Sequence, residues 1–511
     1  MERAYRRERI QRRISMDYSV LYDKTNTDSI AAYSKLLEGK TFADVIAEKI
    51  GNNNHEEILR AYGNKARKGG LGNLLEEIYY GYKANSKQDA DFEEAGVELK
   101  VTCYEVNKNG SLRAGERLVL TMISYEEPVE KDFYKSHAWR KMSKIMLIYY
   151  WRNKLLNSNL LYKIGYTKLF TPPEEDLMII RKDYTYIINK IESGKAHELS
   201  EADTMYLGAC TKGANAEKST VPQYYGSHLP ARKRAFCFKN SYMTYVLNHY
   251  IIGSSEEEKI IKNPLEIKEK TFGEILMERL GAYKGMLDTE LAERYEINIA
   301  NKGYRALLAY AMLGVKGNKA EEFIKANIEV KTIRFDKNGR NPEHFRLHDF
   351  DFKELASQDW EDSELYEQLS STQFLLVVYQ ETDAGIAYIG SQLWHMNSEQ
   401  LETVHQGWEA VKNKLNEGVT LTLEVKADGS EVIHNDLPGV SDNPIFHVRP
   451  HQSQTHYKFH DGSEHGKGTM SNCNELPDGQ YMPTHAYWLH SKFITSILDR
   501  NLIHIHTGND Q

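Results

Sequence analysis

Three residues that could support metal-dependent hydrolysis lie close together in the sequence: Asp91, Glu98 and Lys100. From Val97 onward apolar and polar residues alternate, as in a β-strand, so Glu98 and Lys100 share one face. Asp91 approaches them across a short turn. Two carboxylates that converge there suit a hard cation such as Mg²⁺, and a lysine beside the ion could hold or deprotonate an attacking water. These groups suffice to hydrolyse a phosphodiester bond, although an exposed strand with a salt bridge would give the same short pattern.

The segment Asp91–Lys100 resembles the active-site signature of the MutH family, which lies in the PD-(D/E)xK nuclease superfamily. Four other segments resemble further parts of that family, in its order and spacing: a first active-site helix at 68–76, a lysine-containing segment at 136–141, a DNA-reading region at 194–215 and a closing element at 234–244. The long second half of the chain is similar to the duplicated restriction-endonuclease branch, which recognises GATC, and not to the short mismatch-repair branch.

The resemblance implies a type II restriction endonuclease that cleaves double-stranded DNA at GATC, before the G, with a DNA methyltransferase as its genetic partner. It implies Mg²⁺ as the cofactor, with Mn²⁺ able to substitute. The catalytic residues that it implies are Asp91, Glu98, Lys100, Glu76 and Lys141, and the implied metal ligands are Asp91, Glu98 and Leu99. Without the family match, Glu76 would be read as an ordinary solvated helix carboxylate.

A polar stretch and a basic–aromatic cluster are the candidate DNA contacts. Residues 195–215 offer hydrogen-bond donors and an aromatic face, which can read base edges in the major groove. Residues 232–239 interleave arginine and lysine with phenylalanine, and such residues usually contact phosphates. The candidate DNA-binding residues are Tyr206, Thr211, Lys212, Asn215, Arg234, Lys239 and, in the second half, Arg449. Any single one of them could instead be an ordinary surface residue.

The elements that must position these residues include both helices and strands. Apolar spacing predicts helices at 41–51, 55–62, around 74–79 and at 174–194, and alternation or apolar runs predict strands at 97–103, 116–124 and 144–151. We therefore expect an α/β fold in which a mixed β-sheet is flanked by helices.

Much of the first half of the chain recurs in the second. Thr271–Gly281 repeats the pattern of Thr41–Gly51, and Glu322–Lys331 repeats that of Asp91–Lys100 at nearly the same offset. Because the matched segments keep their order, we predict two tandem MutH-like domains. The predicted parts are an N-terminal extension at 1–40, a catalytic domain at 41–252, a polar linker at 253–270 and a pseudo-catalytic, DNA-binding effector domain at 271–511.

The two copies differ at the positions that would carry the chemistry. The changes are Asp91 to Glu322, Glu76 to Ala309 and Lys141 to Ser370, whereas Glu329 and Lys331 are retained. A site without its helix carboxylate and with one lengthened arm should hold Mg²⁺ poorly, because Mg²⁺ requires near-ideal octahedral geometry. The degenerate second site, with Glu322, Glu329 and Lys331, is therefore expected to bind a second DNA site without cutting it.

Length, net charge and cysteine content limit the classes of protein that fit this sequence. The chain of 511 residues is long enough for more than one domain, and its net charge of −8 argues against a generally basic nucleic-acid binder without excluding a nuclease. Its 4 cysteines are far apart and predict neither a zinc site nor disulfides, which fits a reducing cytoplasm. The longest apolar run, near 145–151, is too short to span a membrane.

Several features leave alternatives open. The arginine-rich N-terminus could touch DNA phosphates or form a solvated tail. A solvated, partly DNA-facing loop, with a zinc site as the alternative, is expected for the histidines of the second copy: His447, His451, His456, His460, His465, His485 and His490. The active species could be a monomer that loops two DNA sites or a DNA-induced dimer. The alternative functions are a MutH-like nicking enzyme of mismatch repair and a non-cleaving DNA-binding regulator.

Overall fold

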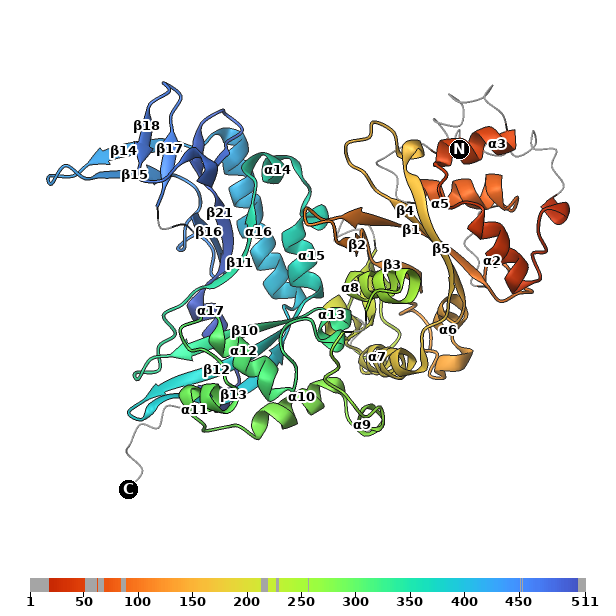
Figure 1. The fold of residues 1–511 in the computed structure, drawn as a ribbon, viewed down its shortest axis with the longest axis horizontal. Helices are drawn as coiled ribbons and strands as arrows, with labels where there is room; N and C mark the ends of the chain where they lie inside the picture. The colour runs from red at the N-terminus through yellow and green to blue at the C-terminus, as the bar shows by residue number, and fades with distance from the viewer. Residues whose placement is uncertain are drawn as a thin grey trace. The chain divides into compact units, whose positions relative to one another are not determined.

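The computed structural model describes residues 18–50, 62, 69–83, 89–212, 219–226, 229–255, 257–450, 452 and 454–503. The chain forms two compact units (Figure 1). Unit 1 comprises Met1–Glu269 and Glu321–Asn327, and unit 2 comprises Lys270–Ala320 and Ile328–Gln511. The arginine-rich N-terminus lies outside the described residues, and so does the helix predicted at 55–62, apart from Tyr62.

In its described residues, unit 1 contains three sheets, of four, three and two strands, together with helices that pack against them. Its strands are β1 (Glu98–Val106), β2 (Leu112–Ala114), β3 (Leu118–Met122), β4 (Ile145–Trp151), β5 (Lys163–Phe170), β6 (Leu207–Thr211), β7 (Thr220–Val221), β8 (Ala231–Arg232) and β9 (Arg234–Phe238). Its α-helices are α2 (Thr27–Lys35), α3 (Phe42–Ile50), α5 (Gly70–Leu74), α6 (His137–Met142), α7 (Glu174–Glu192), α8 (Asn240–Tyr245), α9 (Leu265–Glu269) and α13 (Glu321–Ala326). π-Helical turns follow α5 and α8, at η3 (Leu75–Tyr79) and η8 (Val246–Ile252).

The main sheet of unit 1 has the order β2-β1-β4-β5, with β1 parallel to β4 and β4 antiparallel to β5. The first five residues of β4, 145–149, are all buried, as expected of a strand covered on both faces. Val97 and Leu99 point into a core formed with α2 and α3, and these helices and α5 lie on one face of the sheet (Figure 1). A second sheet has the order β3-β9-β6. The strands predicted at 97–103, 116–124 and 144–151 are thus confirmed as β1, β3 and β4.

Residues 18–40 differ from the predicted N-terminal extension. α2 buries Ile30 and Tyr33, and the Tyr33 ring stacks on Tyr79 with centroids 4.4 Å apart. The N–H of Gly39 donates to the carbonyl of Ile164 on β5 (2.9 Å). The segment is polar overall, but its apolar residues recur at helical spacing and complete the core of unit 1.

Unit 2 repeats the plan of unit 1. Its strands are β10 (Ile328–Phe335), β11 (Phe345–Phe350), β12 (Gln373–Thr382), β13 (Gly385–Trp394), β14 (Leu421–Val425), β15 (Glu431–Asn435), β16 (Phe446–Pro450), β17 (His456–Lys458), β18 (Glu464–Gly466), β19 (Cys473–Glu475), β20 (Tyr481–Pro483) and β21 (His485–Leu489). Its helices are α10 (Phe272–Gly281), α11 (Asp288–Arg294), α12 (Tyr304–Met312), α14 (Phe352–Ser357), α15 (Glu364–Ser371), α16 (Ser398–Glu417) and α17 (Ser491–Ser496).

Two sheets of unit 2 match two sheets of unit 1 in the order and direction of three strands each. β10 runs parallel to β12, and β12 runs antiparallel to β13, as β1, β4 and β5 do. The sheet β11-β21-β16 has the connectivity of β3-β9-β6. Glu329 lies opposite Phe374 in the first pair, just as Glu98 lies opposite Ile145. The predicted α/β fold with a duplicated mixed sheet is confirmed.

Helix α13 belongs to unit 1 although the chain on both sides of it belongs to unit 2. Lys325 on this helix is buried, and its amine donates to Asp176 Oδ1 on α7 (2.5 Å), to Glu321 Oε1 (2.7 Å) and to the Tyr250 hydroxyl (2.8 Å). The same amine lies 4.4 Å from the centre of the Tyr245 ring. A buried lysine is tolerated here because acidic groups and aromatic faces surround it.

The polar linker predicted at 253–270 is also part of unit 1. Ile260 and Ile261 are buried, and their backbone N–H groups donate to the carboxylate of Glu322 (3.0 and 2.8 Å). α9 ends the segment at Glu269, where unit 1 gives way to unit 2. Charged residues made this segment look solvated, but its isoleucine pair and the hydrogen bonds to Glu322 tie it to α13.

The structure also shows the environment of the cysteines and the character of the helices. All four cysteines are free: Cys103, Cys210 and Cys237 are buried and Cys473 is half-buried. Over the described ranges no helix is both long and apolar enough to cross a membrane.

Candidate active site

Four elements of unit 1 bring the predicted catalytic residues together. β1 carries Glu98 and Lys100, and the turn before β1 carries Asp91. Lys141 lies in the last turn of α6, just before β4, and Glu76 lies in the π-helical turn η3. Because β1 and β4 are neighbours, α6 delivers its lysine directly to the face of β1 that carries Glu98.

Glu98 is the centre of this cluster. Its side chain is only 3% exposed, and its two oxygens contact different lysines: Lys100 Nζ lies 2.8 Å from Oε1, and Lys141 Nζ lies 2.9 Å from Oε2. Lys141 also donates to the backbone carbonyl of Asp89 (2.6 Å), which holds its amine over the site. Burying a carboxylate is costly unless it is paired, and two cations meet that requirement here.

Asp91 is fixed by the turn that leads into β1. Phe92 and Val97 exchange two backbone hydrogen bonds (2.9 and 3.2 Å), which close the turn. Asp91 Oδ2 accepts a hydrogen bond from the backbone N–H of Leu99 (2.9 Å). Burial, reinforced by the negative charge of Glu98, raises the pKa of Asp91 to about 6. The Asp91 carboxylate is therefore held beside Glu98 in a poorly solvated place.

Glu76 faces the same cluster from η3. Helix α5 approaches β1 closely at Gly72. If this glycine carried a Cβ, that atom would lie 3.9 Å from Val101 Cβ and 4.0 Å from Glu76 Oε1. Burial raises the pKa of Glu76 to about 7, the charge of Asp91 adds to the effect, and Lys100 opposes it. With every group ionised, three carboxylates would face two ammonium groups in one half-buried site.

This set of groups fits a hard divalent cation by type. Asp91, Glu98 and Glu76 offer carboxylate oxygens and Leu99 offers a backbone carbonyl, which are ligands that Mg²⁺ accepts. The raised pKa values of Asp91 and Glu76 mark a site that gains from added positive charge. Within the part of the chain that the structure describes, no three His, Cys, Asp or Glu side chains are gathered as ligands around one point. The two carboxylate oxygens of Glu98 contact the amines of Lys100 and Lys141.

Three of the predicted DNA contacts are buried, which corrects the sequence-based assignment. Tyr206 is 1% exposed and stacks on the Tyr242 ring, with centroids 5.0 Å apart. The amine of Lys239 is fully buried and donates to a backbone carbonyl. Arg234 on β9 is buried as well and donates to the carbonyl of Ala209 (2.7 Å). A side chain that satisfies its polar atoms inside the protein is not placed to grip DNA.

The other predicted DNA contacts are more accessible. Thr211 and Lys212 are half-buried at the end of β6. In unit 2, Arg449 on β16 is exposed, and its guanidinium lies 3.9 Å from the centre of the Trp488 ring. Asn215 lies outside the described residues, as does Lys68 at the start of the predicted active-site helix.

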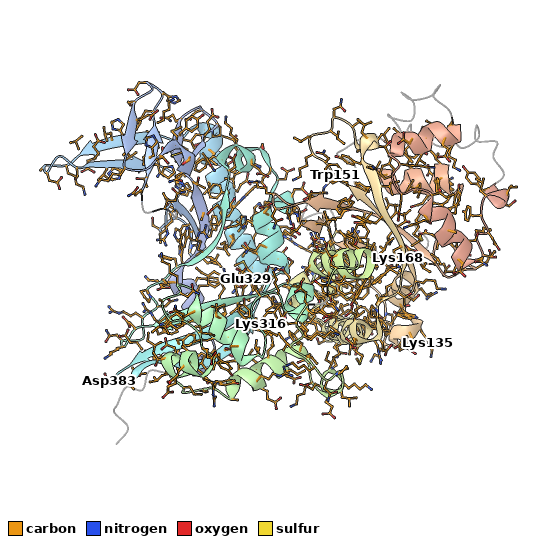
Figure 2. The ribbon with its side chains drawn as sticks, viewed as in Figure 1. Lys135, Trp151, Lys168, Lys316, Glu329 and Asp383 are labelled. Carbon is orange, nitrogen blue, oxygen red and sulfur yellow. The ribbon has the colours of Figure 1, made fainter. Side chains whose placement is uncertain are left out.

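Unit 2 keeps part of the active-site arrangement on β10. Lys331 Nζ lies 2.6 Å from Oε1 of Glu329, which is labelled in Figure 2. The register of the strands places Ser370 at the position of Lys141, so the second lysine is missing. Gln368, on the same helix as Ser370, donates to Glu329 Oε2 (3.2 Å) instead. Sequence reasoning missed Gln368, although an amide two positions before Ser370 was a usable signal.

Glu322, the predicted counterpart of Asp91, has its hydrogen-bond partners in unit 1. It belongs to unit 1, where both of its oxygens accept backbone hydrogen bonds from Ile260 and Ile261. Its side chain therefore has a structural role, and the predicted second site is corrected to the pair Glu329 and Lys331.

The histidines of the second copy are less exposed than predicted. His447, His485 and His490 are 2%, 1% and 7% exposed, so these three do not lie in a solvated loop. The rings of His344, His447 and His490 lie between 4.8 and 5.8 Å apart at one end of the sheet β11-β21-β16. His451 lies outside the described residues.

Comparisons with known proteins match both units. The family model for the DNA mismatch repair enzyme MutH matches residues 80–183, which include β1 and β4, and residues 313–407, which include β10 and β12. The type II restriction enzyme Sau3AI of Staphylococcus aureus is 34% identical over 84% of this chain and 92% of its own length. The DNA mismatch repair protein MutH of Vibrio parahaemolyticus is 26% identical over 43% of this chain and 92% of its own. MutH of Escherichia coli K12 is 25% identical over 44% of this chain and 93% of its own.

Proposed function

Because the chain belongs to the type II restriction enzymes of the MutH family, we propose that unit 1 hydrolyses both strands of duplex DNA at GATC with Mg²⁺ as its cofactor. The observation that carries the proposal is the buried Glu98 with one lysine on each oxygen, beside Asp91 on the Leu99 N–H. The assignment to GATC is supported by the resemblance of the whole chain to the duplicated branch that recognises this sequence. Cytoplasmic location and a protecting DNA methyltransferase complete the proposal.

The residues divide into metal ligands and cations. Asp91 and Glu98 would hold the ion with the carbonyl of Leu99, and Glu76 would assist from η3. When bound, Mg²⁺ supplies positive charge that stabilises the negative charge developing on the phosphate. Lys100 and Lys141, whose amines both contact the Glu98 carboxylate, would supply the positive charge of the protein at the same place. One amine would orient the attacking water and the other would neutralise charge on the phosphate oxygens.

We assign the recognition of the DNA sequence to the accessible end of β6. Thr211 and Lys212 are the predicted reading residues that remain half-buried at a strand end, where a side chain can turn toward a groove. The buried Tyr206, Arg234 and Lys239 support this region from inside. Tyr206 stacks on Tyr242 of α8, Arg234 donates to Ala209 of β6, and Lys239 donates to the carbonyl of Thr204 just before β6.

Unit 2 is proposed to bind a second GATC site without cutting it. Its Glu329 has one lysine instead of two, and Ala309 replaces the helix carboxylate, so a Mg²⁺ site would lack ligands and charge. The exposed Arg449, whose guanidinium lies over the Trp488 ring, is the candidate for a DNA contact in this unit. Binding there would act as an effector of cleavage in unit 1.

The test is digestion of plasmids with one or two GATC sites, methylated and unmethylated, with and without Mg²⁺. Glu98→Ala is the inactive variant, and Glu94→Ala, in the exposed part of the turn before β1, is the matched control. Double-strand cutting at GATC that is lost in Glu98→Ala, kept in Glu94→Ala and faster with two sites is the expected result. Nicking alone would favour the repair activity, and GATC binding without any cleavage would make the protein a regulator.

A further inference from the structure

Tyr82 lies next to the active-site carboxylates but has no role in the proposed reaction so far. It follows the π-helical turn η3, and its backbone N–H donates to the carbonyl of Glu76 (3.0 Å). Its ring meets the ring of Phe92 edge-on, with centroids 5.4 Å apart. Glu76 is a site residue, and Phe92 directly follows Asp91. Tyr82 therefore contacts both of the segments that carry these carboxylates.

The Tyr82 hydroxyl is buried and has no hydrogen-bond partner among the residues that the structure describes. Five other tyrosines of the same core have bonded hydroxyls. The hydroxyls of Tyr18, Tyr22, Tyr33 and Tyr79 donate to the backbone carbonyls of Ile78 (2.7 Å), Tyr80 (2.9 Å), Tyr79 (3.1 Å) and Tyr33 (2.7 Å), and the Tyr80 hydroxyl is hydrogen-bonded to Ser34 Oγ (2.6 Å). A buried polar group without a partner is costly, and one kept beside a functional site calls for an explanation.

Electrostatic interactions link Tyr82 to two of the site carboxylates. Burial raises the pKa of Tyr82 well above its ordinary value, and the negative charges of Asp91 and then Glu76 add to the effect. The phenol therefore keeps its proton at neutral pH and can donate a hydrogen bond to an ionised carboxylate.

We propose that Tyr82 is a positioning residue of the metal site, whose hydroxyl donates a hydrogen bond to the Asp91 carboxylate when the ion is bound. The inference rests on the proposed metal-dependent nuclease and deepens it. Among the residues that the structure describes, Asp91 accepts a hydrogen bond from the Leu99 N–H. A second donor would fix the orientation of the ligand, as outer groups do around metal sites in general.

The test is Mn²⁺ binding to the full-length protein, measured by the loss of the free-ion signal in electron paramagnetic resonance. Tyr82→Phe removes the hydroxyl and keeps the ring against Phe92. Tyr125→Phe is the matched control, because the Tyr125 hydroxyl is also buried without a partner in the described part of the chain but has no site carboxylate among its electrostatic neighbours. Asp91→Ala identifies which bound Mn²⁺ occupies the site.

Tyr82→Phe should weaken Mn²⁺ binding by about tenfold, whereas Tyr125→Phe should change it less than about twofold. Thermal unfolding separates positioning from packing. Without metal, Tyr82→Phe should melt at or above the wild-type temperature, because an unpaired hydroxyl is removed, and the upward shift produced by Mn²⁺ should shrink.

The outcomes separate this inference from the proposed function. Wild-type binding that depends on Asp91 supports the metal site, and unchanged Mn²⁺ affinity in Tyr82→Phe would then overturn the role of Tyr82 alone. A lower melting temperature with an intact Mn²⁺ shift would also overturn it, because it would make Tyr82 a packing residue. Absence of Asp91-dependent binding in the wild-type protein would overturn the metal site, and the inference with it.

Discussion

Metal binding by unit 1 should depend steeply on pH between 6 and 8. Two of its carboxylates have raised pKa values: Asp91 near 6 and Glu76 near 7. A carboxylate whose pKa is raised keeps its proton as the pH falls, and a protonated carboxyl group is a poor ligand. Affinity for the ion should therefore increase as the pH rises through these two values, because the ion competes with protons.

The size of the effect follows from the two pKa values. At pH 6 about half of the Asp91 side chains and about a tenth of the Glu76 side chains are ionised, if the two titrate independently. Both are ionised in about a twentieth of the molecules at pH 6 and in most of them at pH 8, so the affinity should rise about 20-fold. In Glu76→Gln only Asp91 remains to titrate, and the rise should shrink to about twofold.

Mn²⁺ titrations of the full-length protein at half-unit steps from pH 6 to 8 measure this dependence. Glu94→Gln, in the exposed part of the same turn, is the matched control and should keep the wild-type profile. A flat profile in the wild-type protein, or an unchanged steep one in Glu76→Gln, would refute the reasoning.

Three further predictions concern the lysines and the second unit. Lys141→Met should slow plasmid cleavage at least about 100-fold, because the site loses a cation. The control is Lys135→Met, at the exposed Lys135 labelled in Figure 2, which should leave the cleavage rate unchanged. Lys325→Met should lower the free energy of unfolding by about 3–5 kcal/mol in urea, because two buried carboxylates lose their cation; a loss under about 1 kcal/mol would contradict this. Glu329→Ala should not change the cleavage rate on one-site plasmids, and slower cutting would show that unit 2 has a catalytic part.

The proximity of the candidate catalytic residues could be predicted from the sequence because its signals are local. Alternation along 97–103 placed Glu98 and Lys100 on one face, and the observed strand and ion pair agree. Lys141 precedes a strongly apolar strand, and the pairing of that strand with β1 brings it to Glu98. The order of the repeated segments was likewise enough to predict the duplicated sheets.

The DNA-facing residues could not be predicted in the same way, because burial depends on distant partners. Arg234 and Lys239 flank a run of aromatic residues that looks like a phosphate-binding surface. That run is β9, the central strand of its sheet, with β3 on one side and β6 on the other. Nothing within the run itself reveals that it will be enclosed. Glu322 was misplaced for the same reason, since its partners Ile260 and Ile261 lie far from it in sequence.

The route of the chain through α13 has a consequence for the evolution of the duplicated gene. A fragment that ends at Glu269 would contain almost all of unit 1 but would lack the helix that gives Asp176 its cation. The two copies can therefore no longer be separated by a single cut, as two freshly joined genes could. Deleting the second half of the chain, α13 included, would remove part of the interior of unit 1. Any truncation that removes α13 is therefore expected to destabilise unit 1 as well.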